Sequence, residues 1–79
     1  MPTVLRVGPY RFFFYSADGN EPRHIHVDRD DKEAKFWLDP MVHLAFNHGF
    51  SRGELRGVLR IIRARIVHLR RSWDDFFNP

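Results

Sequence analysis

The chain has 79 residues, no cysteine and a formal net charge of +3, from 13 Lys and Arg against 10 Asp and Glu. A chain of this length supports one hydrophobic core, so we expect a single domain over residues 1–79. Without cysteine, neither a disulfide framework nor a thiolate metal site can form. Eight Phe, two Tyr and two Trp supply apolar surface for a core, and a homodimer is another route to stability for so short a chain.

Composition also bounds location and partners. No apolar run approaches the ~18 residues of a membrane span, and the opening lacks the basic and apolar regions of a signal peptide. We therefore expect a cytoplasmic protein with no membrane partner. Eleven of the 13 basic residues are Arg, whose planar guanidinium favours bidentate contacts with phosphate or carboxylate.

The first half of the chain reads as four strands separated by turn signals. TVLRV ends at Gly8-Pro9, YRFFFYS ends at the turn-rich ADGNEP, and HIHVD ends at RDDK. EAKFWLD then alternates apolar and polar residues, as a strand with one buried face does. The pattern predicts an antiparallel meander with strands at about 3–7, 10–16, 24–28 and 33–39.

The second half reads as helical. Asp39 and Pro40 resemble an N-cap and a first helical residue, which predicts a short helix over 40–48. The sequence SRGE that follows is a capping box, with Ser51 as N-cap and Glu54 three residues later.

A long helix is expected from about 52 to 77. At ~100° per residue, its apolar side chains fall in one stripe, which should pack on one face of the sheet. The stripe consists of Leu55, Val58, Leu59, Ile62, Ile66, Leu69, Trp73, Phe76 and Phe77. The predicted fold class is therefore α+β.

Three stretches carry a resemblance to a known family: MPTVLRVGPYRFFFYSADGNEPRHIHV, EAKFWLDP and GFSRGELRGVLRII. Over nearly the whole chain, the sequence resembles an uncharacterised family of short bacterial proteins catalogued as a domain of unknown function. The resemblance implies a small bacterial cytosolic protein, often encoded beside another small protein in toxin–antitoxin-like pairs. It supplies no catalytic residues. Arg23 stands where relatives usually carry Pro, which makes the turn before His24 less rigid.

The segment HIHVD offers a candidate metal site. Alternation along a strand places His24, His26 and Asp28 on one face, directed outward, while Ile25 and Val27 point inward. Two imidazoles and a carboxylate form a three-ligand set that suits zinc or iron. The sequence as a whole favours a protein without a cofactor, and a divalent metal at these residues is the alternative. A further ligand could come from the short helix (His43 or His48). The competing interpretation is a polar sheet face without a metal.

The same histidines suit a metal-independent endoribonuclease. His24 and His26 would act as general acid and base, Arg11 or Arg23 would bind the phosphate, and Tyr15 would donate a proton. The alternative for each arginine is a solvated strand end.

The long helix offers a candidate binding surface. Its arginines fall on one flank of the helical wheel, namely Arg52, Arg56, Arg60, Arg63, Arg70 and Arg71. Such a flank can follow a phosphate backbone, dock an acidic protein, or simply solubilise a helix face. Trp37, outward by alternation, would be a stacking platform or part of a secondary core. The sequence favours a binding domain that contacts nucleic acid or a cognate small protein in a toxin–antitoxin-like module.

Overall fold

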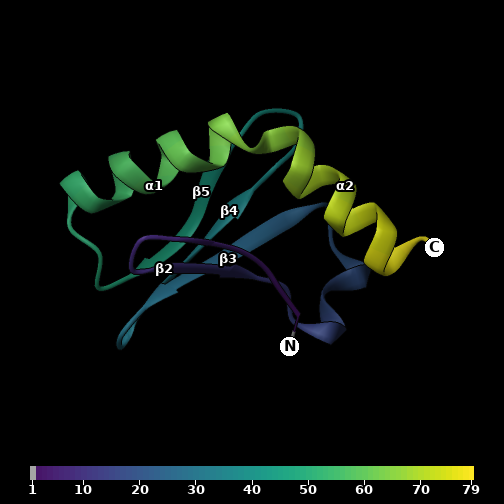
Figure 1. The fold of residues 1–79 in the computed structure, drawn as a ribbon, viewed down its shortest axis with the longest axis horizontal. Coiled ribbons are helices and arrows are strands. Elements are labelled where there is room, and N and C mark those ends of the chain that lie inside the picture. Colours follow the sequence, from purple (N-terminus) through teal and green to yellow (C-terminus); the bar gives the residue numbers. More distant parts are fainter. Residues whose placement is uncertain (1) are drawn as a thin grey trace.

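The computed structural model describes residues 2–79, and its sheet is an antiparallel meander of five strands in the order β1-β2-β3-β4-β5. Figure 1 shows the sheet below the two helices. The strands are β1 (Thr3–Val7), β2 (Tyr10–Phe13), β3 (His24–Arg29), β4 (Lys32–Trp37) and β5 (His43–His48). A 3-10 helix, η1 (Ser16–Asn20), connects β2 to β3. The antiparallel meander and the α+β class predicted from the sequence are confirmed.

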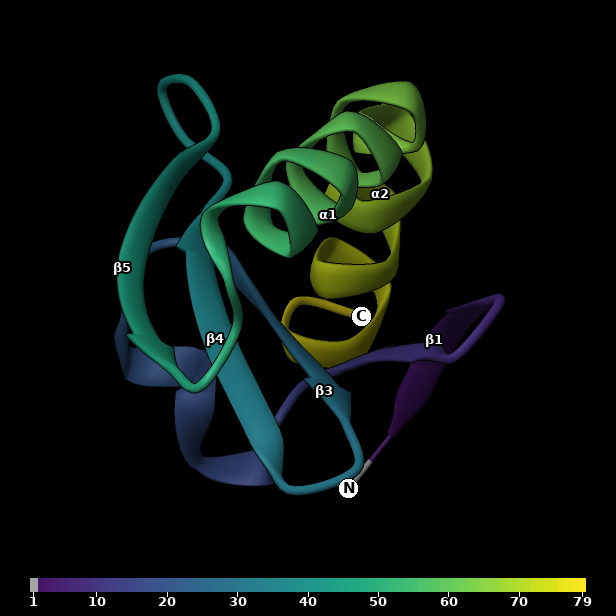
Figure 2. The same cartoon turned by 90° about the vertical axis from the view of Figure 1, so that its left-hand side faces the viewer.

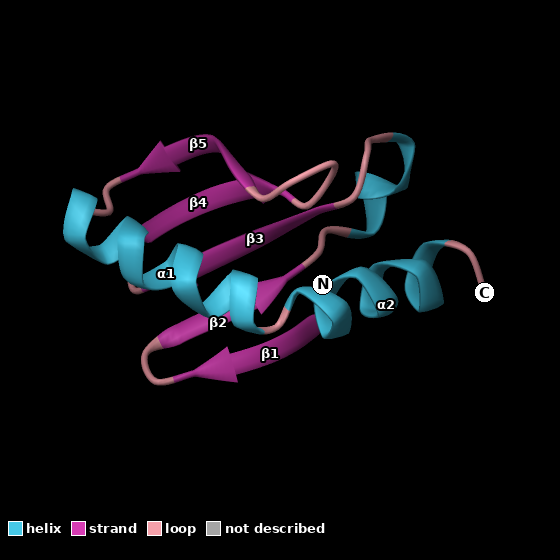
Figure 3. Ribbon diagram, turned by 90° about the horizontal axis from the view of Figure 1, so that it is seen from above, coloured by secondary structure: helices cyan, strands magenta, loops and turns pink. Residues whose placement is uncertain are grey.

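Both helices lie on one side of the curved sheet, as Figure 2 shows in profile and Figure 3 from above. The first, α1 (Arg52–Ala64), begins with the predicted capping box: Ser51 Oγ accepts from the Glu54 N–H at 3.1 Å, and the Ser51 N–H donates to Glu54 Oε1 at 3.4 Å. The second, α2 (Ile66–Phe77), continues to the C-terminus. Within residues 2–79, no helix is long and apolar enough to cross a membrane.

The prediction of a short helix over 40–48 is wrong. Residues His43–His48 form β5, which pairs with β4 from Trp37↔His43 to Glu33↔His48. The pairing satisfies backbone donors and acceptors along β4 that a helix at this place would leave open. Asp39 therefore caps no helix, and its carboxylate instead binds Arg23.

The single helix expected over 52–77 is interrupted. At Arg65 the backbone turns to φ −115° and ψ 20°, and its N–H is shared between the carbonyls of Ile61 and Ile62, at 3.1 Å each. The residue is neither Pro nor Gly, so no local signal marks the break. The apolar stripe continues across it, with Ile62 buried before the break and Leu69 after it.

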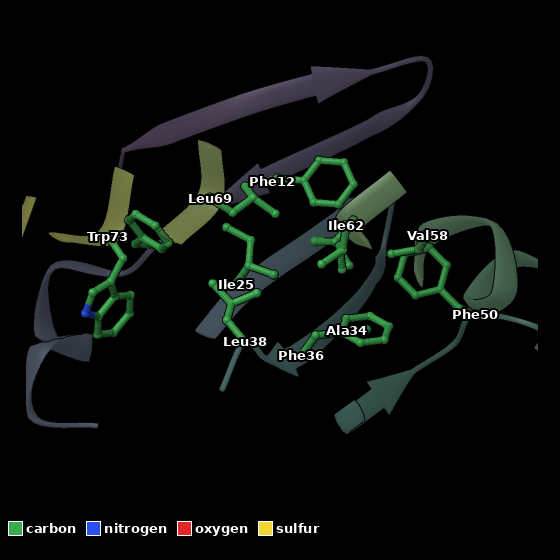
Figure 4. Packing of buried hydrophobic residues seen from close by; sticks show 12 residues of the cluster. Phe12, Ile25, Ala34, Phe36, Leu38, Phe50, Val58, Ile62, Leu69 and Trp73 are labelled. Atoms are coloured by element: carbon green, nitrogen blue, oxygen red, sulfur yellow. The ribbon is translucent and has the colours of Figure 1, made fainter. Parts of the chain in front are cut away.

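The core lies between the helices and one sheet face. Figure 4 shows strand side chains meeting helix side chains in one layer. The residues that are buried there include Phe12, Ile25, Val27, Ala34, Phe36 and Leu38 from the sheet side, and Val58, Ile62, Leu69 and Trp73 from the helices. Ile25 and Val27 of β3 thus point inward, as alternation predicts, which places His24 and His26 on the opposite face.

Candidate functional site

His24 and His26 do not face solvent, contrary to the expected outward orientation. Their exposed fractions are 0% and 5%. Aromatic rings surround them: Phe13 stacks on His26 with ring centres 5.4 Å apart, and Tyr15 meets the same ring edge-on at 4.6 Å. Trp73 of α2 reaches His24, with ring centres 4.9 Å apart. The histidines therefore form a buried cluster at the end of the sheet nearest α2.

Asp18 completes this cluster. The 3-10 helix η1 places Asp18 Oδ2 3.0 Å from His24 Nε2 and 3.1 Å from His26 Nε2. The same oxygen accepts the Tyr15 N–H at 2.9 Å, which fixes the carboxylate. In the sequence, Asp18 is marked only as part of a turn. Its six-residue separation from His24 gives no periodic signal, so the sequence does not indicate it as a metal-binding or catalytic residue.

The other ring nitrogens face oxygen atoms. His24 Nδ1 lies 2.9 Å from the Pro22 carbonyl oxygen, and because a carbonyl only accepts, this nitrogen carries a proton. His26 Nδ1 lies 3.4 Å from Glu33 Oε2 without forming a hydrogen bond. Both rings therefore direct Nε2 toward Asp18 and Nδ1 toward a second oxygen.

Burial governs the protonation of His26. Desolvation lowers the pKa of its imidazole below the usual value, and the charges of Asp18 and Glu33 oppose this shift without overcoming it. The ring thus favours its neutral form although two carboxylates lie within ion-pair distance. The Tyr15 hydroxyl donates a hydrogen bond to Glu33 and lies 3.1 and 3.2 Å from its two carboxylate oxygens. Burial, together with the charge of that carboxylate, raises the pKa of the Tyr15 phenol.

Asp28, the carboxylate expected to bind a metal, is engaged elsewhere. Arg11 holds it in a bidentate pair, with Nε–Oδ1 at 3.2 Å and Nη2–Oδ2 at 2.7 Å. The Arg11 guanidinium also lies 4.2 Å from the centre of the Phe13 ring. The structure therefore pairs one candidate metal ligand with one candidate catalytic cation, and it places Asp18 beside the histidines instead. His43 and His48, considered as further ligands, lie on β5 and are exposed.

Arg23, another candidate catalytic residue, joins β3 to α2. It binds Asp39 through Nε at 2.7 Å and Nη2 at 3.0 Å, and Asp74 through Nη1 at 3.1 Å. Arg70 approaches the same Asp39 at 3.3 Å and donates to the Leu38 carbonyl oxygen at 2.9 Å. Arg70 therefore does not lie with the free arginines of the predicted binding flank. It stabilises the packing of α2 instead.

This network should make stability depend on pH. The hydrogen bonds from Arg23 lower the pKa of Asp39 below its usual value, so the ionised carboxylate stabilises the fold above the pKa of the unfolded chain. That contribution is lost as pH falls through the lower folded pKa. We expect Asp39→Asn to cost about 1–2 kcal/mol at neutral pH, toward the lower value because a third of the side chain is exposed and screened. In urea titrations the cost should vanish in acid, whereas Asp31→Asn, an exposed carboxylate without an ion pair in the described chain, should show no such trend.

The remaining binding candidates divide between the two helices and the sheet. Arg52, Arg56, Arg60 and Arg63 are exposed along α1, and Arg71 is exposed on α2, beyond the break. None of these arginines has an ion pair with a described residue. Trp37 is partly buried, with Lys35 Nζ 4.3 Å from its ring centre and His24 at its edge. Its ring is thus occupied on one side by the chain itself.

The geometry separates the chemistries that the sequence leaves open. General acid–base work on RNA needs histidines that reach a substrate, and these two are buried under aromatic rings. The candidate cations Arg11 and Arg23 are each held by carboxylates. The arrangement instead supports a fixed polar cluster inside the domain and a free basic surface on α1.

The fold and these two features define a small α+β domain with a buried histidine–aspartate cluster and an arginine-covered helix. The chain belongs to the family described as Domain of unknown function (DUF4160), whose model matches residues 10–74. The family resemblance seen in the sequence is thereby confirmed. No curated protein and no solved structure matches the chain.

Proposed function

We propose that the chain binds the phosphate backbone of nucleic acid through the α1 arginine surface, formed by Arg52, Arg56, Arg60 and Arg63. The proposal rests on the exposure of these four side chains and on their lack of ion pairs in the described chain. All are exposed, and among residues 2–79 no carboxylate pairs with any of them. Most other charged side chains near the sheet and α2 form internal ion pairs. Unpaired positive charge is therefore most concentrated on α1.

Spacing along α1 suits a repeating anion. The four arginines follow at intervals of four, four and three residues, which keeps them on neighbouring rows of the helix and spans about 16 Å. Arg56, Arg60 and Arg63 line one hollow together with Leu59. Duplex DNA carries one phosphate charge per ~1.7 Å of axis, so about ten phosphates pass along a surface of this length.

The surface suits nucleic acid better than an acidic protein. The centre of a protein interface is usually built from large apolar or aromatic side chains, whereas phosphate contacts need only donors. The exposed large hydrophobics of the described chain are Tyr15, Met41, Leu44, Val67 and Phe76. None of them lies on α1. The surface of α1 therefore offers a partner positive charge but no exposed large apolar side chain.

The salt dependence of binding tests the proposal. If four arginines each neutralise one phosphate, log K should fall against log salt with a slope of about −3.6 for duplex and about −2.8 for a single strand. Between about 50 and 200 mM KCl the affinity for duplex should therefore drop about 100-fold. Fluorescence anisotropy with labelled duplex DNA and single-stranded RNA measures both slopes.

A flat response over this salt range, or no binding at the lowest salt, would contradict the proposal. The toxin–antitoxin-like module implied by the family resemblance belongs to the same proposal, with the cognate small protein as the competing partner. Co-expression with the neighbouring gene product separates the two. A tight protein complex that forms through α1, with no nucleic-acid binding by either form, would favour that competitor.

A further inference from the structure

We propose that Asp18, His24 and His26 bind a divalent metal ion of the zinc class inside the domain. One ligand atom from each residue lies within 4.8 Å of the other two. The set differs from the one that the strand pattern suggests, because the carboxylate comes from η1 and not from β3. The site is separate from the α1 arginine surface, so neither proposal depends on the other.

The orientation of His24 is the first support. Its Nδ1 must donate to the Pro22 carbonyl, so a neutral ring carries a lone pair on Nε2. That buried nitrogen lies 3.0 Å from Asp18 Oδ2, yet it makes no hydrogen bond to any described residue. A lone pair directed at a carboxylate oxygen is unfavourable unless a cation or a second ring proton lies between them. Since the ring is fully buried, water cannot relieve the conflict.

His26 brings a second imidazole to the same carboxylate. Its Nε2 is hydrogen-bonded to the same Asp18 oxygen at 3.1 Å, a contact that a bound metal would replace, and its buried Nδ1 lies 3.4 Å from Glu33 Oε2 without a hydrogen bond. Histidines that bind metals typically donate their other ring N–H to a backbone carbonyl or a carboxylate, which fixes the tautomer. Pro22 supplies that carbonyl for His24, whose Nε2 is thus arranged as the ligand atom. For His26, Glu33 is the carboxylate nearest Nδ1 and would accept its proton once Nε2 binds the metal.

Distance and donor type indicate the class of ion. In tetrahedral zinc sites the metal lies 2.0–2.2 Å from nitrogen and oxygen ligands, so two ligand atoms are about 3.3 Å apart. The two distances from Asp18 Oδ2 are 3.0 and 3.1 Å, within a few tenths of an ångström of that value. Two imidazoles with one carboxylate favour zinc or a similar transition metal over magnesium and calcium, which prefer oxygen ligands.

Local charge also favours a cation. Three carboxylates lie within ion-pair distance of the rings, namely Asp18, Glu21 and Glu33. Lys35, paired with Glu21 at 2.5 Å, is the cation beside them. With neutral imidazoles the net charge of these groups is −2, which one divalent ion balances. The described chain offers three ligands, so the fourth position is open to water or to an atom of a bound partner.

Zinc titration of the untagged full chain tests the site. After dialysis against EDTA, calorimetry with zinc chloride should give one ion per chain, and magnesium should not compete. A ligand that binds only the folded chain raises Tm, so zinc at about 100 times its Kd should raise Tm by about 10 °C or more. Cobalt(II) in place of zinc should give the visible absorption of a tetrahedral site.

Substitutions locate the ligands. Asp18→Asn keeps an acceptor for the Tyr15 N–H but removes the charge, and it should weaken zinc binding by at least about 100-fold. His26→Gln should do the same. Asp28→Asn, which removes the carboxylate paired with Arg11 on β3, should leave zinc affinity unchanged. Absence of one-to-one binding, wild-type affinity in Asp18→Asn, or loss of binding in Asp28→Asn would overturn the proposal.

Discussion

Trp73→Ala is expected to lower the free energy of unfolding by about 3–5 kcal/mol, the usual cost of removing a large buried aromatic side chain. The side chain is 3% exposed. Its ring centre lies 5.2 Å from that of Phe14 and 4.2 Å from that of Phe77, and it also contacts His24. One residue therefore joins α2 to the sheet and to the buried histidine cluster.

This expected loss is large relative to the total free energy of unfolding of the domain. A chain of this size has a net stability of about 4–12 kcal/mol, so the variant should be largely or partly unfolded at 37 °C. Urea titration followed by far-UV circular dichroism measures the change without relying on the deleted fluorophore. Trp73→Phe should recover most of the loss. Phe76→Ala on the same helix removes a ring that is 45% exposed and should cost less than about 1.5 kcal/mol. Equal costs for Trp73→Ala and Phe76→Ala would show that α2 does not dock as described.

The architecture follows from the sequence where the signals are local. Alternation identifies β1 to β4, with ends that differ by a few residues, because strand burial has a period of two. The Ser51–Glu54 capping box marks the start of α1 correctly because a cap is a contact between near neighbours. The helical wheel also identifies the exposed arginines of α1.

The failures involve partners that are distant in the chain. Asp39-Pro40 has the appearance of a helix start, and nothing nearby reveals that β4 pairs with residues 43–48. The break at Arg65 has no proline or glycine to mark it. On the wheel, Arg70 belongs with the free arginines, but Asp39 and the Leu38 carbonyl draw it inward. In each case tertiary contacts determine the outcome, and a local pattern does not contain them.

The candidate metal cluster shows the same division. The alternation HIH correctly puts two imidazoles on one face, but it predicts neither their burial nor their carboxylate. Asp28 fits the alternation and is taken by Arg11, which the sequence cannot pair with it. Asp18 reaches the rings because η1, in the connection between β2 and β3, holds its carboxylate 3.0 and 3.1 Å from their Nε2 atoms. Sequence periodicity thus identifies the strand that carries the candidate cluster, and η1, which precedes that strand, contributes its carboxylate.

Replacing Arg56, Arg60 and Arg63 together with Gln is expected to weaken duplex DNA binding about 100- to 500-fold at about 0.1 M salt. Each phosphate contact contributes about 0.9 to the salt slope, so the slope should fall by about 2.7. These three side chains line the hollow on α1. Gln has a helix propensity close to that of Arg, and all three positions are exposed, so the fold should be retained. Anisotropy over a salt series gives both the affinity and the slope.

A charge-matched control separates a local surface from net charge. Arg6, Arg65 and Arg71 are also exposed and have no ion pair among residues 2–79, and replacing all three with Gln changes the formal charge from +3 to 0, as the α1 variant does. If phosphates lie along α1, the control should lose less than about tenfold in affinity and keep most of its slope, because general attraction alone is reduced. Equal losses in the two variants would mean that binding follows overall charge. In that case the arginines of α1 would serve as a solvated helix face and not as a nucleic-acid surface.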